Sequence, residues 1–357
     1  MIKTCIPQKS LLFTLFLFVF LFSCDTGQDN IIVTPIEEEP DKPFFINLPD
    51  PVFEAELIAR GIDTDGEVNQ KMLEEDALNV TYLDLFYSGS DPDEKITDLT
   101  GIEGFTNLKE LIVGNNALTA ISLNENTALE KLYLNSNQLS AIELSNNPAL
   151  TYLSIGRNEL QGIDVSANVN LQYLNLEANS IKSLDVSNNP KLVELSVLVN
   201  ELSSITGLEQ TTGLKKLNLG WNDLESLTLN ISSLEWINIE QNLLTNLNVN
   251  GCTSLTSLIA TNNSLKQLDL HSNVSLQYLK VSANEIEQVD LSKNLALELF
   301  WISNNHLAKL DVSKLSKLYD LSIFGNADLS CIKTLDDQTI ATVRKGDHQE
   351  LSAGVCE

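Results

Sequence analysis

The chain contains few side chains that could carry out catalysis, and their spacing does not bring them together. It has three histidines, His271, His306 and His348, and none stands beside both a nucleophile and an orienting acid. Gly114 and Gly156 lack the spacing of a phosphate-binding loop. The sequence therefore predicts a protein that is not an enzyme and that needs no cofactor.

Acidic residues could bind metal ions. Five of them recur at equivalent repeat positions, namely Asp164, Asp185, Asp269, Asp290 and Asp311. Like charges on neighbouring strands repel, and calcium would relieve that repulsion. The alternative, which we favour, is a solvated acidic face where each carboxylate bonds a nearby serine or backbone group. Asp63-Thr64-Asp65-Gly66 begins like a calcium loop but lacks the later ligands, so a turn explains it and no metal site is predicted.

Aromatic and large apolar residues occupy outward positions of the predicted strands or their rim. Exposed aromatic side chains dominate the energetics of interfaces, so we expect a ligand-binding face there, centred on Leu198, Val199, Trp221 and Trp236. The alternative is cross-strand packing that stabilises the array. Alanine at Trp221 and Trp236 should leave the fold intact and abolish ligand capture. The whole candidate face comprises Tyr133, Tyr152, Tyr173, Leu198, Val199, Trp221, Trp236, Tyr278 and Trp301.

A column of asparagines sets the register of these positions. The step is 21 residues, except for one unit of 22 and one of 20 between Asn200 and Asn242. A fixed period of this size indicates a solenoid, which offers long surfaces and no closed catalytic pocket. The ladder residues, for which we predict a structural role, are Asn116, Asn137, Asn158, Asn179, Asn200, Asn222, Asn242, Asn263, Asn284, Asn305 and Asn326.

Each unit contains the same short pattern twice. Residues 129–137 read Leu-x-x-Leu-x-Leu-x-x-Asn, and residues 139–147 repeat it with isoleucine at one position. Each Leu-x-Leu predicts a short strand with alternate side chains inward. The asparagine amide can satisfy backbone groups that stacking would otherwise bury unpaired. We therefore expect parallel, extended segments on both faces of a β-rich solenoid, with few or no helices on the convex side.

Solenoids need caps at both ends. Asp50-Pro51 is typical of a helix start and Gly61 of a stop, so we predict one helix at about 51–60. A second helix is expected near 71–78, and both should cover a first strand at 82–86. The repeat array is assigned to 81–326, between an N-terminal cap at 46–80 and a C-terminal cap at 327–357.

The cysteines and the N-terminus indicate export. Residues 1–23 read as a signal peptide, with Lys3 and Lys9 before an apolar run, and residues 24–45 read as an acidic, proline-rich tether. Cys331 and Cys356 either form a disulfide that closes the C-terminal cap, which we favour, or remain free. Cys252 replaces an asparagine in a repeat. Without residues 1–23 the charge is 20 bases against 49 acids, or −29, which argues against nucleic-acid binding.

Two family resemblances add to this interpretation. Leu21-Phe22-Ser23-Cys24 resembles a bacterial lipobox, which implies lipidation at Cys24; plain secretion is the alternative. The repeat resembles the leucine-rich repeat family, and the capping region is similar to surface lipoproteins of the Bacteroidota and more distantly to internalins.

The resemblance implies a chain exported and lipid-anchored to the bacterial outer membrane or cell surface, with that anchor as its only membrane contact. It implies binding of a protein partner, in adhesion, reception or scaffolding. Glycan binding is the main alternative, at a local cleft such as one near Tyr152, Arg157 and Tyr173. A signalling adaptor is a further alternative if the chain is not exported.

Overall fold

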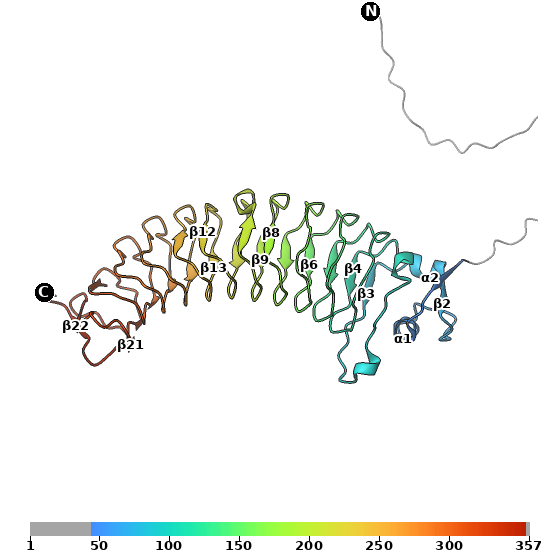
Figure 1. Ribbon diagram of the computed structural model, residues 1–357, viewed down its shortest axis with the longest axis horizontal. Helices are drawn as coiled ribbons and strands as arrows, with labels where there is room; N and C mark the ends of the chain where they lie inside the picture. Colours follow the sequence, from blue (N-terminus) through green and yellow to red (C-terminus); the bar gives the residue numbers. More distant parts are fainter. Residues whose placement is uncertain (1–43, 355–357) are drawn as a thin grey trace, which may run out of the picture. The chain divides into compact units, whose positions relative to one another are not determined.

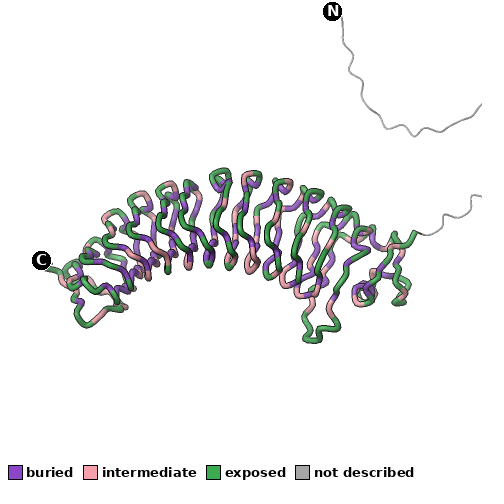
Figure 2. Tube along the Cα trace, viewed as in Figure 1, coloured by how far each residue is buried: buried purple, intermediate pink, exposed green. Residues whose placement is uncertain are grey.

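A computed structural model describes residues 44–354 of this chain. The predicted signal peptide, Cys24, nearly all of the predicted tether and Cys356 lie outside these residues. The repeats form short coils that stack side by side along a shallow arc (Figure 1). Buried residues recur in every coil from one end of the array to the other (Figure 2). The solenoid predicted from the asparagine period is therefore confirmed.

One face of the array is a continuous parallel sheet of 13 strands, called the long sheet below. Each strand has three residues; the central one is buried in every strand except β21, where it is partly buried, and the flanking two point outward. Neighbouring strands pair in register, so equivalent repeat positions form columns across the sheet. Its strands are β3 (Tyr82–Asp84), β4 (Glu110–Ile112), β5 (Lys131–Tyr133), β6 (Tyr152–Ser154), β7 (Tyr173–Asn175), β9 (Glu194–Ser196), β11 (Lys216–Asn218), β13 (Trp236–Asn238), β15 (Ser257–Ile259), β16 (Tyr278–Lys280), β17 (Leu299–Trp301), β19 (Asp320–Ser322) and β21 (Thr342–Arg344).

The opposite face, called the back face below, carries only short parallel ladders. Elsewhere on this face the chain is extended or turning without strand pairing. Its strands are β8 (Ser183–Asp185) with β10 (Ser204–Thr206), β12 (Ser226–Thr228) with β14 (Asn246–Asn248), and β18 (Leu310–Asp311) with β20 (Cys331–Lys333) and β22 (Glu350–Ser352). Between residues 79 and 354 the helical elements are three short 3-10 turns, η1 (Pro92–Glu94), η2 (Ile102–Gly104) and η3 (Leu208–Gln210). The expectation of few helices outside the N-terminal cap is confirmed.

The asparagine ladder bonds successive coils together. Asn137 shows the pattern: its Nδ2 donates to Leu134 O in its own coil (3.0 Å) and to Val113 O in the preceding coil (3.0 Å). Its Oδ1 accepts the backbone N–H of Leu118 (3.1 Å). Most ladder asparagines repeat these three contacts. The predicted structural role is confirmed, because the side chain satisfies backbone groups in two coils at once.

A second asparagine column lies under the back face and uses only half of the amide. Asn147 Nδ2 donates to Leu123 O and Asn126 O of the preceding coil, both at 3.0 Å. Its Oδ1 has no partner among the described residues. Cys252 occupies the same column, as predicted, and its Sγ lies 3.8 Å from Leu229 O. A position that needs only a donor tolerates substitution, whereas the first ladder keeps asparagine in every coil from Asn116 to Asn326.

The N-terminal cap differs from the prediction in its second half. Helix α1 (Pro51–Ala59) matches the predicted helix, but α2 spans only Glu74–Leu78. Residues 71–73, predicted as helical, form β2 (Lys71–Leu73), which pairs antiparallel with β1 (Phe45–Asn47). Glu54 explains the change, because its buried carboxylate accepts N–H bonds from Asn69, Gln70 and Lys71 and holds them extended. This antiparallel pair also includes Phe45, the last residue of the predicted tether.

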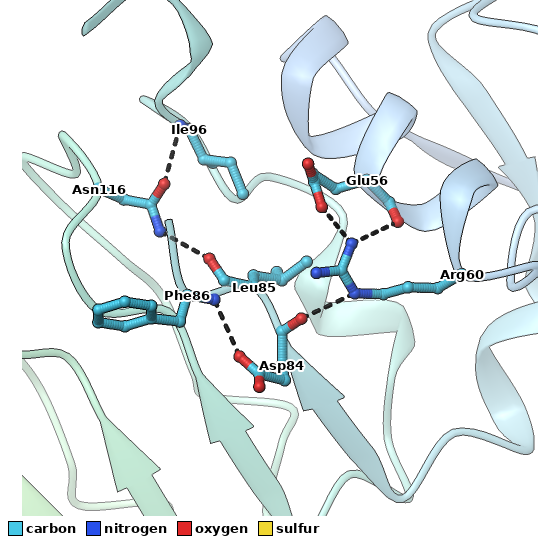
Figure 3. A network of polar contacts seen from close by, with 7 residues as sticks. All are labelled: Glu56, Arg60, Asp84, Leu85, Phe86, Ile96 and Asn116. Carbon is cyan, nitrogen blue, oxygen red and sulfur yellow. Dashed lines mark hydrogen bonds and ion pairs between the residues drawn. The ribbon is translucent and has the colours of Figure 1, made fainter. Parts of the chain in front are cut away.

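The cap covers the exposed edge of the long sheet at β3 (Figure 3). Arg60, just after α1, donates from Nε to Asp84 O on β3 (2.7 Å) and pairs with Glu56 one turn earlier. On the other side of β3, Asn116 donates to Leu85 O (2.9 Å). An unpaired edge strand is a template for association, and here a guanidinium occupies it.

Asp50 joins α1 to the first coil. Its Oδ1 accepts the N–H groups of Val52 and Phe53, which confirms the predicted N-cap, and its Oδ2 accepts those of Thr97 and Asp98. Burial alone would raise the pKa of Asp50, but the N–H bonds from Thr97, Phe53 and Asp98 together hold it below its ordinary value. The carboxylate is therefore charged at neutral pH and links two elements.

The array continues past the predicted boundary at Asn326. Strand β21 pairs with β19 and extends the long sheet, while β22 pairs with β20 on the back face. The described residues of the predicted C-terminal cap thus continue the array with a further coil. Cys331 lies at the start of β20, and its disulfide with Cys356 stays a prediction because Cys356 lies outside the described residues.

Candidate binding surfaces

The predicted ligand-binding face divides into separate clusters. Tyr133, Tyr152 and Tyr173 form a stack across β5, β6 and β7. Ring centroids lie 4.6 Å apart for the first pair and 4.2 Å for the second, whose rings are nearly parallel at 3°. Burial and the neighbouring Tyr173 raise the pKa of Tyr152, so its hydroxyl stays protonated. The ring faces of this stack contact each other, which matches the cross-strand packing alternative and leaves no open cleft between Tyr152 and Tyr173.

Trp301 is enclosed by polar partners on the long sheet. Lys280 Nζ lies 4.2 Å from its ring centroid, and the Arg344 guanidinium lies 5.3 Å away. Its Nε1 donates to Asp320 Oδ1 (3.1 Å), and Asp320 also forms an ion pair with Arg344 (2.5 Å). Two cations and a carboxylate therefore already use this indole, which is not free to act as a binding platform.

Trp221 and Val199 lie at the rim of the long sheet, beyond the ends of β11 and β9. Each stands directly before a ladder asparagine, in a turn at the end of its strand, and each has a left-handed backbone with φ of 56° and 55°. About half of each side chain is exposed, 52% for Trp221 and 47% for Val199. Neither side chain has a place in the core.

The left-handed turn recurs in eleven coils, and among its residues only Val199 is β-branched and only Trp221 is aromatic. A β-carbon disfavours this conformation by about 1–2 kcal/mol, and β-branched residues adopt it least. Asparagine and glycine tolerate it. The equivalent residues in the other coils are Asn115, Ser136, Arg157, Ala178, Gln241, Asn262, Ala283, Asn304 and Gly325. Two adjacent coils therefore combine strain with exposed apolar surface.

Leu198 belongs to this edge of the array, whereas Trp236 does not. A β-carbon on Gly220 would lie 3.1 Å from Leu198 Cδ1, so Leu198 packs against the backbone next to Trp221. Trp236 begins β13, at the opposite end of the strand from the turns. Tyr278 begins β16 and is 37% exposed. The predicted centre thus reduces to Leu198, Val199 and Trp221, called the turn-edge patch below.

Carboxylates surround the turn-edge patch. Glu201 and Asp223 each lie two residues beyond a patch residue and are exposed. Glu240 lies in the coil next to Trp221, since its backbone carbonyl accepts the Trp221 N–H (2.7 Å), and its carboxylate accepts Asn238 Nδ2 (3.4 Å). Glu201 has an ion pair with Lys182 (3.7 Å), but neither Asp223 nor Glu240 has one among the described residues. The patch is therefore apolar at its centre and acidic at its margin.

The aspartates on the back face bond local groups, as we expected. Oδ1 of Asp164, Asp185, Asp269, Asp290 and Asp311 accepts the backbone N–H two residues later, at 2.8–3.0 Å. Hydrogen bonds from Ser187 lower the pKa of Asp185, and those from Ser292 lower that of Asp290. Among residues 44–354 no group of three or more histidine, cysteine or acidic side chains could hold a metal ion.

The sequence pattern did not point to a hollow on the back face of the array. It measures about 650 Å³ and lies on the back face over three coils, at residues 245–250, 267–269 and 288–290. Its walls include Asn246, Gln267 and Gln288. A signal was present in the column that precedes each back-face core residue, because this column changes from small residues to long amides at Asn246.

Comparison with solved structures identifies the architecture. The internalin J functional domain of Listeria monocytogenes, which includes a cysteine ladder, shares 27% identity with a TM-score of 0.73 over 87% of this chain and 73% of that one. An L. monocytogenes internalin, InlF, gives 23% and 0.67 over 87% and 99%. The chain is a leucine-rich repeat solenoid.

Other similar folds come from further bacteria. A leucine-rich repeat protein of Leptospira interrogans aligns over 78% of this chain and 86% of its own length, with 23% identity and a TM-score of 0.51. No family model matches the sequence, and no curated protein matches it. Among residues 44–354 no helix is long and apolar enough to cross a membrane. The comparisons thus establish the solenoid and leave its ligand to be argued from its surfaces.

Proposed function

We propose that this solenoid is a non-enzymatic cell-surface protein that recognises a protein partner through the turn-edge patch. The observation that carries the proposal is the left-handed backbone of Val199 and Trp221, combined with their exposure. A disfavoured backbone at residues that lie outside the core points to a functional constraint. A half-exposed tryptophan beside two aliphatic residues is also the composition of an interface hot spot.

The margin of the patch indicates the chemistry of the partner. Asp223 and Glu240 would attract a basic surface, while Trp221 and Leu198 would take an apolar side chain. We therefore propose a partner with an apolar anchor flanked by lysine or arginine. A structure of similar fold was solved as the LRIM1/APL1C complex, so the architecture is known in a complex between two proteins.

Export and anchoring belong to the same proposal. The apolar run before Cys24, the lipobox-like sequence and the acidic tether support a lipoprotein that holds the solenoid away from the membrane. A protein that presents one narrow edge to a partner benefits from such a tether. Fractionation of cells expressing the native chain and Cys24→Ala tests this part, since membrane association should require Cys24 and its processing should be sensitive to globomycin.

Quantitative capture tests the recognition surface. The chain without residues 1–23 is immobilised and proteins from the cell's surroundings are quantified by mass spectrometry. Trp221→Asn should reduce capture of the wild-type partner about thirtyfold, because a hot-spot residue contributes about 2 kcal/mol. Ala178→Asn places the same residue in an equivalent turn of another coil and should leave capture unchanged. Equal capture by Trp221→Asn and the wild type would contradict the proposal.

A further inference from the structure

The hollow on the back face occupies a place where the local ladders are interrupted. After β14 strand pairing on this face stops until β18, so the coils at 265–270 and 286–291 pass without strands, as do the coils before β8. The hollow of about 650 Å³ lies over this interval, and a neighbouring hollow of about 610 Å³ shares Gln288 and Val289 with it. Ligand sites commonly have volumes in this range.

Long amide side chains form the walls of the hollow. In the earlier coils the column just before each back-face core residue holds Ala120, Ala141, Gly162, Ser183, Ser204 and Ser226. In the three coils of the hollow it holds Asn246, Gln267 and Gln288. These three amides make no hydrogen bond to any residue between 44 and 354. Each therefore offers both donors and an acceptor to solvent.

The other polar groups are fixed in place by their neighbours. Asp269 Oδ1 accepts the His271 N–H (3.0 Å), and its Oδ2 accepts Asn250 Nδ2 (3.1 Å). Asp290 Oδ1 accepts the Ser292 N–H (2.8 Å). The floor between these side chains is apolar and is formed by Leu247 and Leu268, each buried to more than nine-tenths.

From this arrangement we infer that the amide groove, formed by Asn246, Asn248, Gln267, Gln288, Asp269 and Asp290, binds a neutral oligosaccharide. Sugar hydroxyls both donate and accept, so they match primary amides and carboxylates, while the apolar face of a sugar ring matches the leucine floor. Each of the three coils offers an amide and, two residues later, a second polar group, which suits a repeating chain lying along the array. This site is on the face opposite to the long sheet.

Other ligand classes fit the groove less well. Its lining contains no lysine or arginine, so a sulfated or uronate-containing chain would meet only carboxylates. An added peptide strand would have to lie between β14 and the next coil, but the two coils are held together two residues before β14 by the Ser264 N–H bond to Leu244 O (2.9 Å). The chemistry of the groove thus favours a polyhydroxylated, uncharged ligand.

Calorimetric titration of the chain without residues 1–23 tests the inference. The probes are maltohexaose, cellohexaose, xylohexaose and mannohexaose, with hexagalacturonate and hexalysine as charged counterparts. At least one neutral hexasaccharide should bind with a Kd below 1 mM. The double variant Gln267→Ala/Gln288→Ala should weaken that binding at least tenfold, since two hydrogen-bonding groups are lost.

Control variants separate this site from the turn-edge patch. Ser183→Ala changes the same column in an earlier coil and should leave sugar binding unchanged, as should Trp221→Asn. Failure of all four neutral probes at millimolar concentration overturns the inference. Binding that Trp221→Asn abolishes and the glutamine variant preserves also overturns it, as does groove-dependent binding of hexalysine alone. The proposed recognition of a protein partner is tested independently, by the capture experiment with Trp221→Asn.

Discussion

Trp221 and Trp301 are the same residue type in the same repeat array, yet their surroundings are opposite. Trp301 lies between Lys280 and Arg344 and donates to Asp320, so its ring and its N–H are both used within the chain. Trp221 is half exposed, has a left-handed backbone, and has no such partners among the described residues. An aromatic residue on a repeat surface therefore indicates binding only when nothing within the chain occupies it.

The most direct way to break this comparison is to remove Trp301. Trp301→Ala should lower the free energy of unfolding by about 1–2 kcal/mol, because it removes two cation–π contacts and the bond to Asp320. Trp301→Phe keeps the cation–π contacts and should lose about half as much. Thermal and urea unfolding measure both. Partner capture should persist in both variants, and a loss of capture without a loss of stability would show that Trp301 is also a binding residue.

Asp63 is a buried counterpart to the exposed residues of the turn-edge patch, because its carboxylate is also unfavourably placed. The carboxylate is 3% exposed and neither oxygen has a partner among the described residues. Burial, and then the nearby Asp65, raises the pKa of Asp63 to about 6. The folded state therefore binds the proton more tightly than the unfolded state. Ionisation destabilises the fold progressively between pH 3.8 and 6 and fully above that range.

Replacing this carboxylate should stabilise the protein at neutral pH. Asp63→Asn is expected to raise the free energy of unfolding at pH 7 by about 2 kcal/mol and to have little effect at pH 4. Asp328→Asn, at an exposed position near the other end of the array, is the matched control. Unfolding curves at both pH values with and without calcium measure the effect. A calcium-dependent rise in stability that Asp63→Asn removes would instead assign Asp63 to a metal site.

The repeat could be predicted from the sequence because its information is local and redundant. Every coil repeats the same buried aliphatic positions, and the ladder asparagine satisfies the same backbone groups each time, so the period fixes both faces. The N-terminal cap has no such redundancy. The antiparallel pair of β1 and β2 depends on Glu54, which accepts three N–H bonds from residues 69–71. The helix-like pattern of residues 71–78 does not reveal this contact.

The surfaces were harder to predict than the fold. Valine and tryptophan disfavour a left-handed backbone, so residue type argued against the conformation that Val199 and Trp221 adopt. Arg344 could not be matched to Trp301, because it lies beyond Asn326, where the repeat pattern ends. The amide groove could have been predicted from the sequence, because the column from Ala120 to Ser226 contains only small residues and its next three members carry amides.

The smallest expected effect gives the sharpest test of strain at the turn-edge patch. Val199→Asn should raise the free energy of unfolding by about 0.5–1 kcal/mol, because asparagine tolerates the left-handed backbone better than a β-branched residue and little buried apolar area is lost. Asn262→Val makes the reverse change in an equivalent turn and should destabilise by a similar amount. Urea unfolding of the two variants measures both signs. If Val199→Asn destabilises the protein, the valine contributes packing, and Trp221 alone would then combine a disfavoured backbone with an exposed side chain.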